Sequence, residues 1–102
     1  MRYNKLVRDN IPEIIESKGK KLITHIADKE EFDEKLKEKL KEEVSEFIEN
    51  PEEEELADIL EVINAIINTN NFNKDKIENI RIKKAGERGS FSKKIILDEV
   101  IE

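Results

Sequence analysis

The stretch KEEVSEFIENPEEEELADIL, from Lys41 to Leu60, holds eight glutamates and one aspartate in twenty residues, interleaved with apolar side chains. Apolar residues that recur every three or four positions on both sides of Asn50 and Pro51 predict two amphipathic helices. The asparagine and proline between them are typical of a break in a helix. The stretch therefore predicts two consecutive helices that carry carboxylates close to their apolar faces.

The first of these helices is expected from about Lys29 to Glu49 and the second from about Pro51 to Asn68. Asn50 is expected to cap the second helix, with Pro51 at its first position and Glu53 at the spacing of a capping box. So short a connection requires the two helices to form a tight antiparallel hairpin.

Shorter elements are expected on both sides of the hairpin. On the N-terminal side, Asn10 and Pro12 begin a short helix that stops at Gly19, and LITHIA at residues 22–27 is either an extended piece or a linker. On the C-terminal side, Asn73 caps a helix from about Lys74 to Ala85, GERGS forms a loop, and SKKIIL could form a short strand. The predicted fold is all-α, a helical hairpin within a bundle, in one domain spanning residues 1–102.

Composition restricts the partners that the chain can have. A hydrophobic content of 36% in 102 residues is low for a self-sufficient core, so we expect the bundle to be completed by homo-oligomerisation, with a core shared between subunits. The net charge of -6 argues against a nucleic-acid polymer as partner. Because the sequence has no cysteine, no signal-like N-terminus and no apolar run of ~20 residues, we expect a soluble cytoplasmic protein without a membrane partner.

Carboxylates of the first long helix point toward its apolar side. At about 100° per residue, Leu36, Leu40 and Phe47 fall within about 40° of one another, and Glu43 projects about 20° from Leu36. Glu46 lies at the edge of this stripe, about 60° further round, and Glu42 lies a step beyond it. Glu43 is therefore expected to face the core.

The apolar residues of the second long helix cover an arc of about 160°, wider than one packing face requires. Its members are Leu56, Ile59, Leu60, Val62, Ile63, Ile66 and Ile67. Glu55 falls in the middle of this arc, and Asp58 lies about 60° away at its edge. The helix is therefore expected to be covered on two sides, with neither acid pointing plainly to water.

Two pairs of acids thus face the hairpin interface, Glu43 with Glu46 and Glu55 with Asp58. Burying unpaired carboxylates is costly, so a cation is expected between them. Four oxygen ligands on helices suit Mg²⁺, or Mn²⁺, whereas the lack of cysteine and the single histidine, His25, argue against zinc. The neighbouring acids Glu52, Glu53 and Glu54 need no such cation, because the first turn of a helix favours negative charge.

Basic residues near both ends of the chain are candidate phosphate ligands. Arg81, Lys84 and Arg88 follow one another at helical spacing, and the glycines of GERGS offer backbone N–H groups beside them. Lys5 and Arg8 form a second group on an arm that could close over the acids or reach a neighbouring subunit. Both groups could equally be ordinary solvated charges.

Four segments resemble motifs of one family. EEVSE, from Glu42 to Glu46, is similar to the EExxE element of the all-α NTP pyrophosphatases, the MazG-like and phosphoribosyl-ATP pyrophosphohydrolase superfamily, and ELAD, from Glu55 to Asp58, is similar to their ExxD element. YNKLVRDNIPEII and KKAGERGSFSKKI resemble the flanking motifs of a small MazG-like subfamily. Both acidic elements in order, with two flanking motifs, are more specific than either acidic element alone.

The resemblance implies a helical fold assembled as a homodimer or a dimer of dimers. It also implies Mg²⁺-dependent hydrolysis of a nucleoside triphosphate, or a related phosphoribosyl nucleotide, to the monophosphate and pyrophosphate. It implies that Glu43, Glu46, Glu55 and Asp58 bind the metal and that Glu42 orients or deprotonates the attacking water. Only eight residues separate the two elements, fewer than in many relatives, which leaves the number of metal ions open. The alternative is a non-catalytic helical interaction protein whose apolar face dimerises and whose acids bind divalent cations passively.

Overall fold

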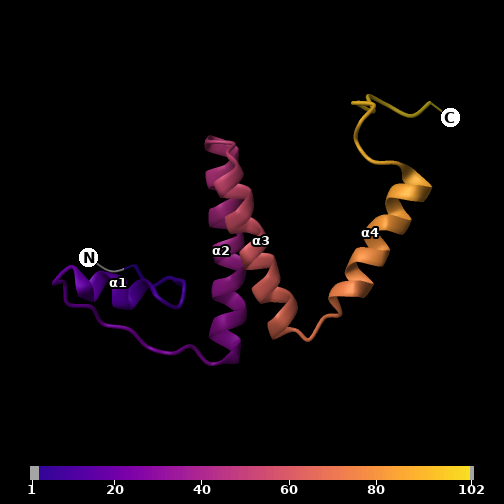
Figure 1. Ribbon diagram of the computed structural model, residues 1–102. Coiled ribbons are helices and arrows are strands. Elements are labelled where there is room, and N and C mark those ends of the chain that lie inside the picture. The colour runs from indigo at the N-terminus through magenta and orange to yellow at the C-terminus, as the bar shows by residue number, and fades with distance from the viewer. Residues whose placement is uncertain (1–2, 102) are drawn as a thin grey trace. The chain divides into compact units, whose positions relative to one another are not determined.

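The computed structural model describes residues 3–101 and is all-helical in that range, as the sequence predicts (Figure 1). Its helices are α1 (Ile11–Ser17), α2 (Lys29–Glu49), α3 (Glu53–Thr69) and α4 (Lys74–Arg88). The chain divides into two compact units, one up to Asn70 with α1, α2 and α3, and one from Asn71 with α4.

Helix α2 begins and ends where its apolar spacing predicts. The side chain of Asp28 caps its first turn by accepting a hydrogen bond of 2.9 Å from the backbone N–H of Glu31. At the other end, the backbone N–H of Asn50 donates to the carbonyl of Glu46. Asn50 therefore completes α2.

Helix α3 begins two residues later than predicted, and the expected N-cap was wrong. A residue before proline is pushed out of the helical region, and Asn50 has φ -142° and ψ 82°. The chain then needs Pro51 and Glu52 to reverse direction, so Asn50 cannot end one helix and start the next. Glu52 takes the N-cap position without a side-chain hydrogen bond, and Glu53, Glu54 and Glu55 form the first turn.

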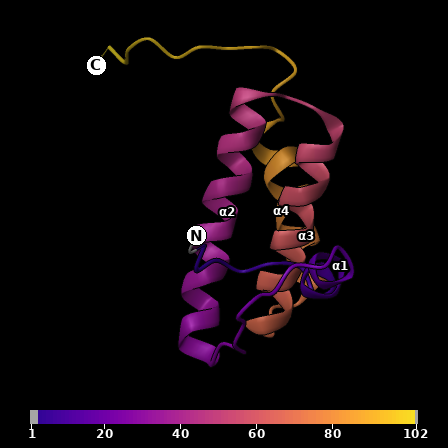
Figure 2. The same ribbon diagram turned by 90° about the vertical axis from the view of Figure 1, so that its left-hand side faces the viewer.

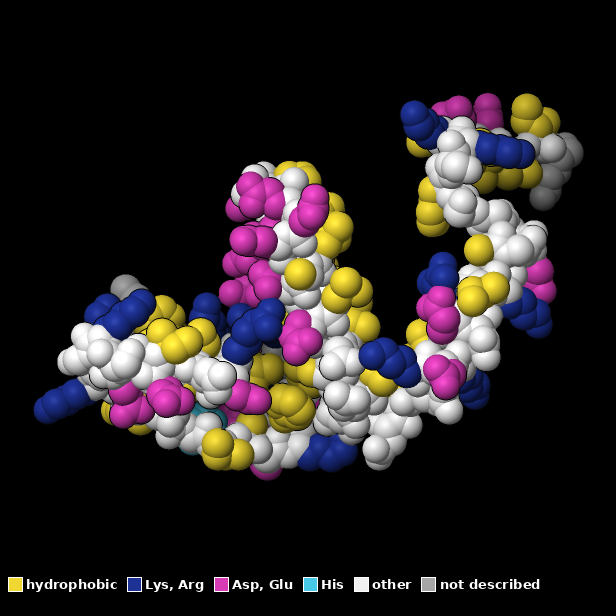
Figure 3. All heavy atoms as spheres, viewed as in Figure 1, with side chains coloured by type: hydrophobic (Ala, Val, Ile, Leu, Met, Phe, Trp, Pro, Cys, Tyr) yellow, Lys and Arg dark blue, Asp and Glu magenta, His cyan; other side chains and the backbone are white. Residues whose placement is uncertain are grey.

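Helices α2 and α3 pack along each other as an antiparallel hairpin, visible from two directions in Figures 1 and 2. Leu36, 3% exposed, and Val62, 8% exposed, are the buried apolar residues among those described. The wide apolar arc of α3 is only partly covered, because Leu56, Leu60 and Ile63 are exposed. Figure 3 shows acidic side chains gathered along one side of the hairpin and hydrophobic side chains along the other.

Residues 3–10, which we call the N-terminal strap, lead into α1 and contact α2. The Lys35 ammonium donates a hydrogen bond of 2.9 Å to the carbonyl of Asn4. After the strap, α1 ends at Ser17, and Gly19 follows two residues later with a φ of 80°, which favours a residue without a side chain. Residues 20–28 then lead to α2 without helix or strand, so LITHIA is a linker.

In the second unit, α4 has its expected start, since the Asn73 side chain accepts a hydrogen bond of 2.9 Å from the backbone N–H of Lys76. Its predicted end at Ala85 was wrong. Gly86 lies inside the helix, because a glycine weakens a helix by about 1 kcal/mol without stopping it. The helix ends where Gly89 adopts φ 83°.

Residues 92–97 form no strand, which corrects the short strand that SKKIIL allowed. No other strand occurs within residues 3–101 to pair with them. None of the helices in this range combines the length and the apolar character that crossing a bilayer requires.

Candidate metal centre

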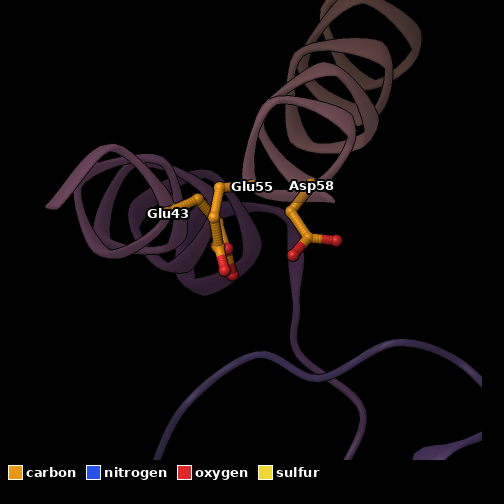
Figure 4. Close-up of side chains that lie close together, drawn as sticks. All are labelled: Glu43, Glu55 and Asp58. Atoms are coloured by element: carbon orange, nitrogen blue, oxygen red, sulfur yellow. The ribbon is translucent and has the colours of Figure 1, made fainter. Parts of the chain in front are cut away.

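Three of the predicted ligands come together at the hairpin. Glu43 projects from α2, and Glu55 and Asp58 project from the first two turns of α3. One carboxylate oxygen from each lies within 4.8 Å of the others. Figure 4 shows the Glu43 and Glu55 carboxylates next to each other, with the Asp58 carboxylate pointing to the same side. The antiparallel packing thus joins residues from two separate acidic motifs.

Glu43 is only 7% exposed, as its position in the apolar stripe predicts, and Glu55 and Asp58 are half-buried. Burial raises the pKa of Glu43 above its ordinary value of 4.5, and the neighbouring Glu46 carboxylate raises it further. The Lys39 ammonium opposes this rise, and Asp58 adds to it. In this structure the centre therefore carries more negative charge than its own surroundings balance.

Two oxygen atoms at the centre lack a hydrogen bond. Among the described residues, neither Glu43 Oε2 nor Glu55 Oε2 has a partner, although both atoms are buried. The position of Glu55 in the first turn of α3 favours its charge but leaves this oxygen unsatisfied. A buried carboxylate oxygen without a partner costs about 1–3 kcal/mol or more, so the donor set fits a hard divalent cation such as Mg²⁺.

Lys39 lies closest to the centre among the basic residues of α2. Its ammonium is 3.5 Å from Glu42 Oε2 and 3.5 Å from Glu43 Oε1, and its side chain is only 19% exposed. On the other side of Glu42, the Lys5 ammonium lies 3.4 Å from Oε1. Each Glu42 oxygen is therefore engaged by a lysine.

The strap also reaches Asp58. Arg8 Nη2 donates to Asp58 Oδ1 at 2.8 Å, across fifty positions of sequence. The structure thus places both predicted basic residues of the strap against acids of the same chain, Arg8 against Asp58 of the centre and Lys5 against the neighbouring Glu42. Without substrate these residues contact carboxylates, and their role in binding phosphates stays a prediction.

Other acids of the hairpin lie outside the centre. Glu46 is exposed and is not part of the three-carboxylate group, although its charge acts on Glu43. Glu52, Glu53 and Glu54 are exposed, as expected for acids at a helix start. His25 pairs with Glu31 at 2.9 Å, beside the start of α2.

The other predicted phosphate ligands, Arg81, Lys84 and Arg88, lie on α4 in the second unit. Arg81 forms an ion pair with Glu78, which lowers the pKa of Glu78. Lys84 and Arg88 are exposed and make no ion pair with any described residue. Arg81 is therefore engaged within its helix, whereas the other two remain available to an anion.

Sequence analysis missed Lys39. Its spacing from Glu42 and Glu43, three and four residues along one helix, was a signal that could have found it.

Comparison of the chain with protein-family models, curated proteins and solved structures gives no match.

Proposed function

We propose that the protein is a Mg²⁺-dependent nucleotide pyrophosphohydrolase of the MazG-like, phosphoribosyl-ATP pyrophosphohydrolase-like type. It would hydrolyse a nucleoside triphosphate, or a related phosphoribosyl nucleotide, to the monophosphate and pyrophosphate. The observation that carries this proposal is the buried Glu43 carboxylate, with one oxygen unpartnered among the described residues, beside Glu55 and Asp58. A solvated acidic surface would not bury such a group.

Glu43, Glu55 and Asp58 would hold the ion, and Glu46 lies near enough to Glu43 to complete the set from the exposed side. A bound divalent ion supplies charge neutralisation for phosphate oxygens and for the leaving pyrophosphate. The protein contributes carboxylates fixed on two packed helices, so that little ordering remains to be done when the ion binds.

Glu42 is suited to accept the proton of the attacking water because it lies beside the centre without belonging to the three-carboxylate group. Water would attack a phosphorus atom of the α,β-phosphoanhydride, and the bond from that phosphorus to the bridging oxygen would break. Attack at the α phosphorus makes pyrophosphate the leaving group, which takes the bonding electrons, whereas attack at the β phosphorus makes the monophosphate the leaving group. In either case the proton of the water passes to Glu42.

Lys5 and Arg8 would bind substrate phosphates, exchanging their surface ion pairs with Glu42 and Asp58 for contacts to a more highly charged anion. Such exposed pairs are each worth roughly 0–1 kcal/mol, so the exchange is inexpensive. Lys84 and Arg88, close to the glycine that ends α4, are also proposed to bind substrate phosphates.

The direct test is a panel of nucleoside triphosphates, diphosphates and phosphoribosyl-ATP, assayed separately for pyrophosphate and orthophosphate. We expect pyrophosphate release from at least one compound with Mg²⁺ and none after chelation by EDTA. Orthophosphate release alone, or release unaffected by EDTA, would contradict the proposal.

A second candidate function, a helical interaction protein that dimerises, is favoured by the exposed apolar side of the hairpin. Leu60 is 65% exposed, and Leu56 and Ile63 flank it at helical spacing on α3, with Ile48 exposed on α2. The same surface would serve an enzyme that assembles as a homodimer or a dimer of dimers. A dimerisation protein, however, gives no reason for burying Glu43.

Sedimentation should detect at least a dimer at micromolar concentration. Leu60→Glu should yield a monomer of unchanged helicity, because this exposed side chain contributes little to the fold of one chain. A monodisperse wild-type monomer would exclude assembly through this surface.

A further inference from the structure

Lys39 is the feature that the proposed reaction leaves unexplained. Its ammonium binds one oxygen of Glu42 and one of Glu43, each at 3.5 Å, between the proposed proton acceptor and the most buried proposed ligand. Its side chain is 19% exposed, compared with 46% for Lys5 and 58% for Arg8. Lys39 is therefore part of the hairpin, whereas the strap residues approach from outside.

Lysine and arginine side chains balance only part of the negative charge at the centre. The acids near the centre are Glu42, Glu43, Glu46, Glu55 and Asp58, and the cations in contact with them are Lys5, Arg8 and Lys39. Five negative and three positive charges leave a surplus of two negative charges. One divalent ion neutralises that surplus, and a second would leave a positive centre.

The hydrogen-bond partners of the carboxylate oxygens also favour a single divalent ion. Both oxygens of Glu42 are engaged by lysines, and so is Glu43 Oε1. Two buried oxygens of the three-carboxylate group, Glu43 Oε2 and Glu55 Oε2, have no partner among the described residues. A second ion shared by Glu42 and Glu43 would have to displace the Lys39 ammonium from a largely buried place.

We propose that the Lys39 ammonium stands in the place of a second cation, so that each chain binds a single divalent ion, held by Glu43, Glu55 and Asp58. This inference rests on the proposed function, because it takes these carboxylates to be a metal centre. Lys39 acts as a positioning residue that fixes Glu42 and Glu43 and limits the number of ions.

The test is a titration of the full-length protein with Mn²⁺, with free Mn²⁺ measured by electron paramagnetic resonance. Wild type should bind one ion per chain. Lys39→Met, which keeps the aliphatic part of the side chain, should bind a second and weaker ion. The double variant Lys39→Met with Glu42→Gln should return to one ion, because the second ion needs the released Glu42 carboxylate.

Lys37→Met is the matched control. Lys37 is exposed on the same helix and pairs with no described acid, so this variant loses the same charge and should still bind one ion. Circular dichroism checks that each variant is folded, and Lys39→Gln repeats the test if Lys39→Met is not.

The outcomes separate this inference from the proposed function. Two ions bound to wild type would overturn the role of Lys39 and leave a metal centre in place. One ion bound to the single variants Lys39→Met and Lys39→Gln would do the same. The absence of Mn²⁺ binding to wild type would overturn the metal centre itself, and the inference with it.

Discussion

Acids at the hairpin interface and acids at the start of α3 are the same residue type in very different surroundings. Glu43 is buried and Glu55 is half-buried, each with an oxygen that no described residue satisfies, whereas Glu53 and Glu54 are exposed to water. Glu53 and Glu55 are only two positions apart in the sequence. At 100° per residue this spacing turns a side chain from solvent to the interface, so azimuth rather than local composition decides what an acid can do.

The largest difference between the acids at the interface and the acids at the start of α3 should appear in catalytic activity. Changing Glu43 or Glu55 to glutamine keeps the shape of the side chain but removes its charge, so pyrophosphate release should fall on the order of 100-fold or more. Glu53→Gln and Glu54→Gln are the matched controls and should retain nearly full activity. If the controls lost activity while Glu55→Gln kept it, the assignment of inner and outer acids would be wrong.

Metal binding should distinguish the same groups through stability. A ligand at one hundred times its dissociation constant stabilises the folded state by about 2.7 kcal/mol, which is roughly 10–20 °C in melting temperature for a chain of this size. At constant ionic strength, Mg²⁺ should therefore raise the melting temperature of wild type and Glu53→Gln but not of Glu43→Gln. An equal rise in all three proteins would indicate a general ionic effect.

The basic residues Lys84 and Arg88 of α4 should differ from the acids in what their substitution changes. Alanine at Lys84 or Arg88 should lower kcat/KM by about tenfold, because each is proposed to contact phosphate and not the metal. The rise in melting temperature with Mg²⁺ should stay intact in both variants. Full activity in the double variant would remove these residues from the site.

The smallest effect concerns the pH dependence of stability in the chelated protein. Because the folded state raises the pKa of Glu43, the stability that its protonated form contributes is complete below 4.5 and is lost as pH rises through the raised pKa. Glutamine stays neutral throughout, so the stability of Glu43→Gln relative to wild type should rise as the pH goes from acidic to neutral. Urea unfolding in EDTA measures this difference, and a gap that does not change with pH would contradict it.

Local patterns predicted most of what depends on one helix at a time. The spacing of apolar residues located α2 correctly from Lys29 to Glu49, and the azimuth of Glu43 predicted its burial. The errors lie at helix ends. Asn50 was expected to cap the second long helix, but the chain needs the next two residues to reverse direction. The last helix was expected to end before Gly86, but the helical turns on both sides of this glycine continue through it.

Contacts between distant segments could not be predicted by the same means. The approach of Arg8 to Asp58 depends on the path of the chain through α1 and residues 20–28, and no periodicity encodes that path. Lys39 differs, because its contacts are local and helical spacing alone would have revealed them. Whether the assembled residues bind a metal or a nucleotide stays a prediction.

The strap also has a consequence for limited proteolysis. Lys20 and Lys21 are exposed between α1 and α2, so trypsin can cut there and separate the strap from an otherwise intact hairpin. A covalent tether gives the strap an effective concentration in the millimolar range, and without it surface ion pairs of about 1 kcal/mol or less cannot hold a free peptide. Cleavage would therefore remove Lys5 and Arg8 together without any mutation and leave the three carboxylates in place.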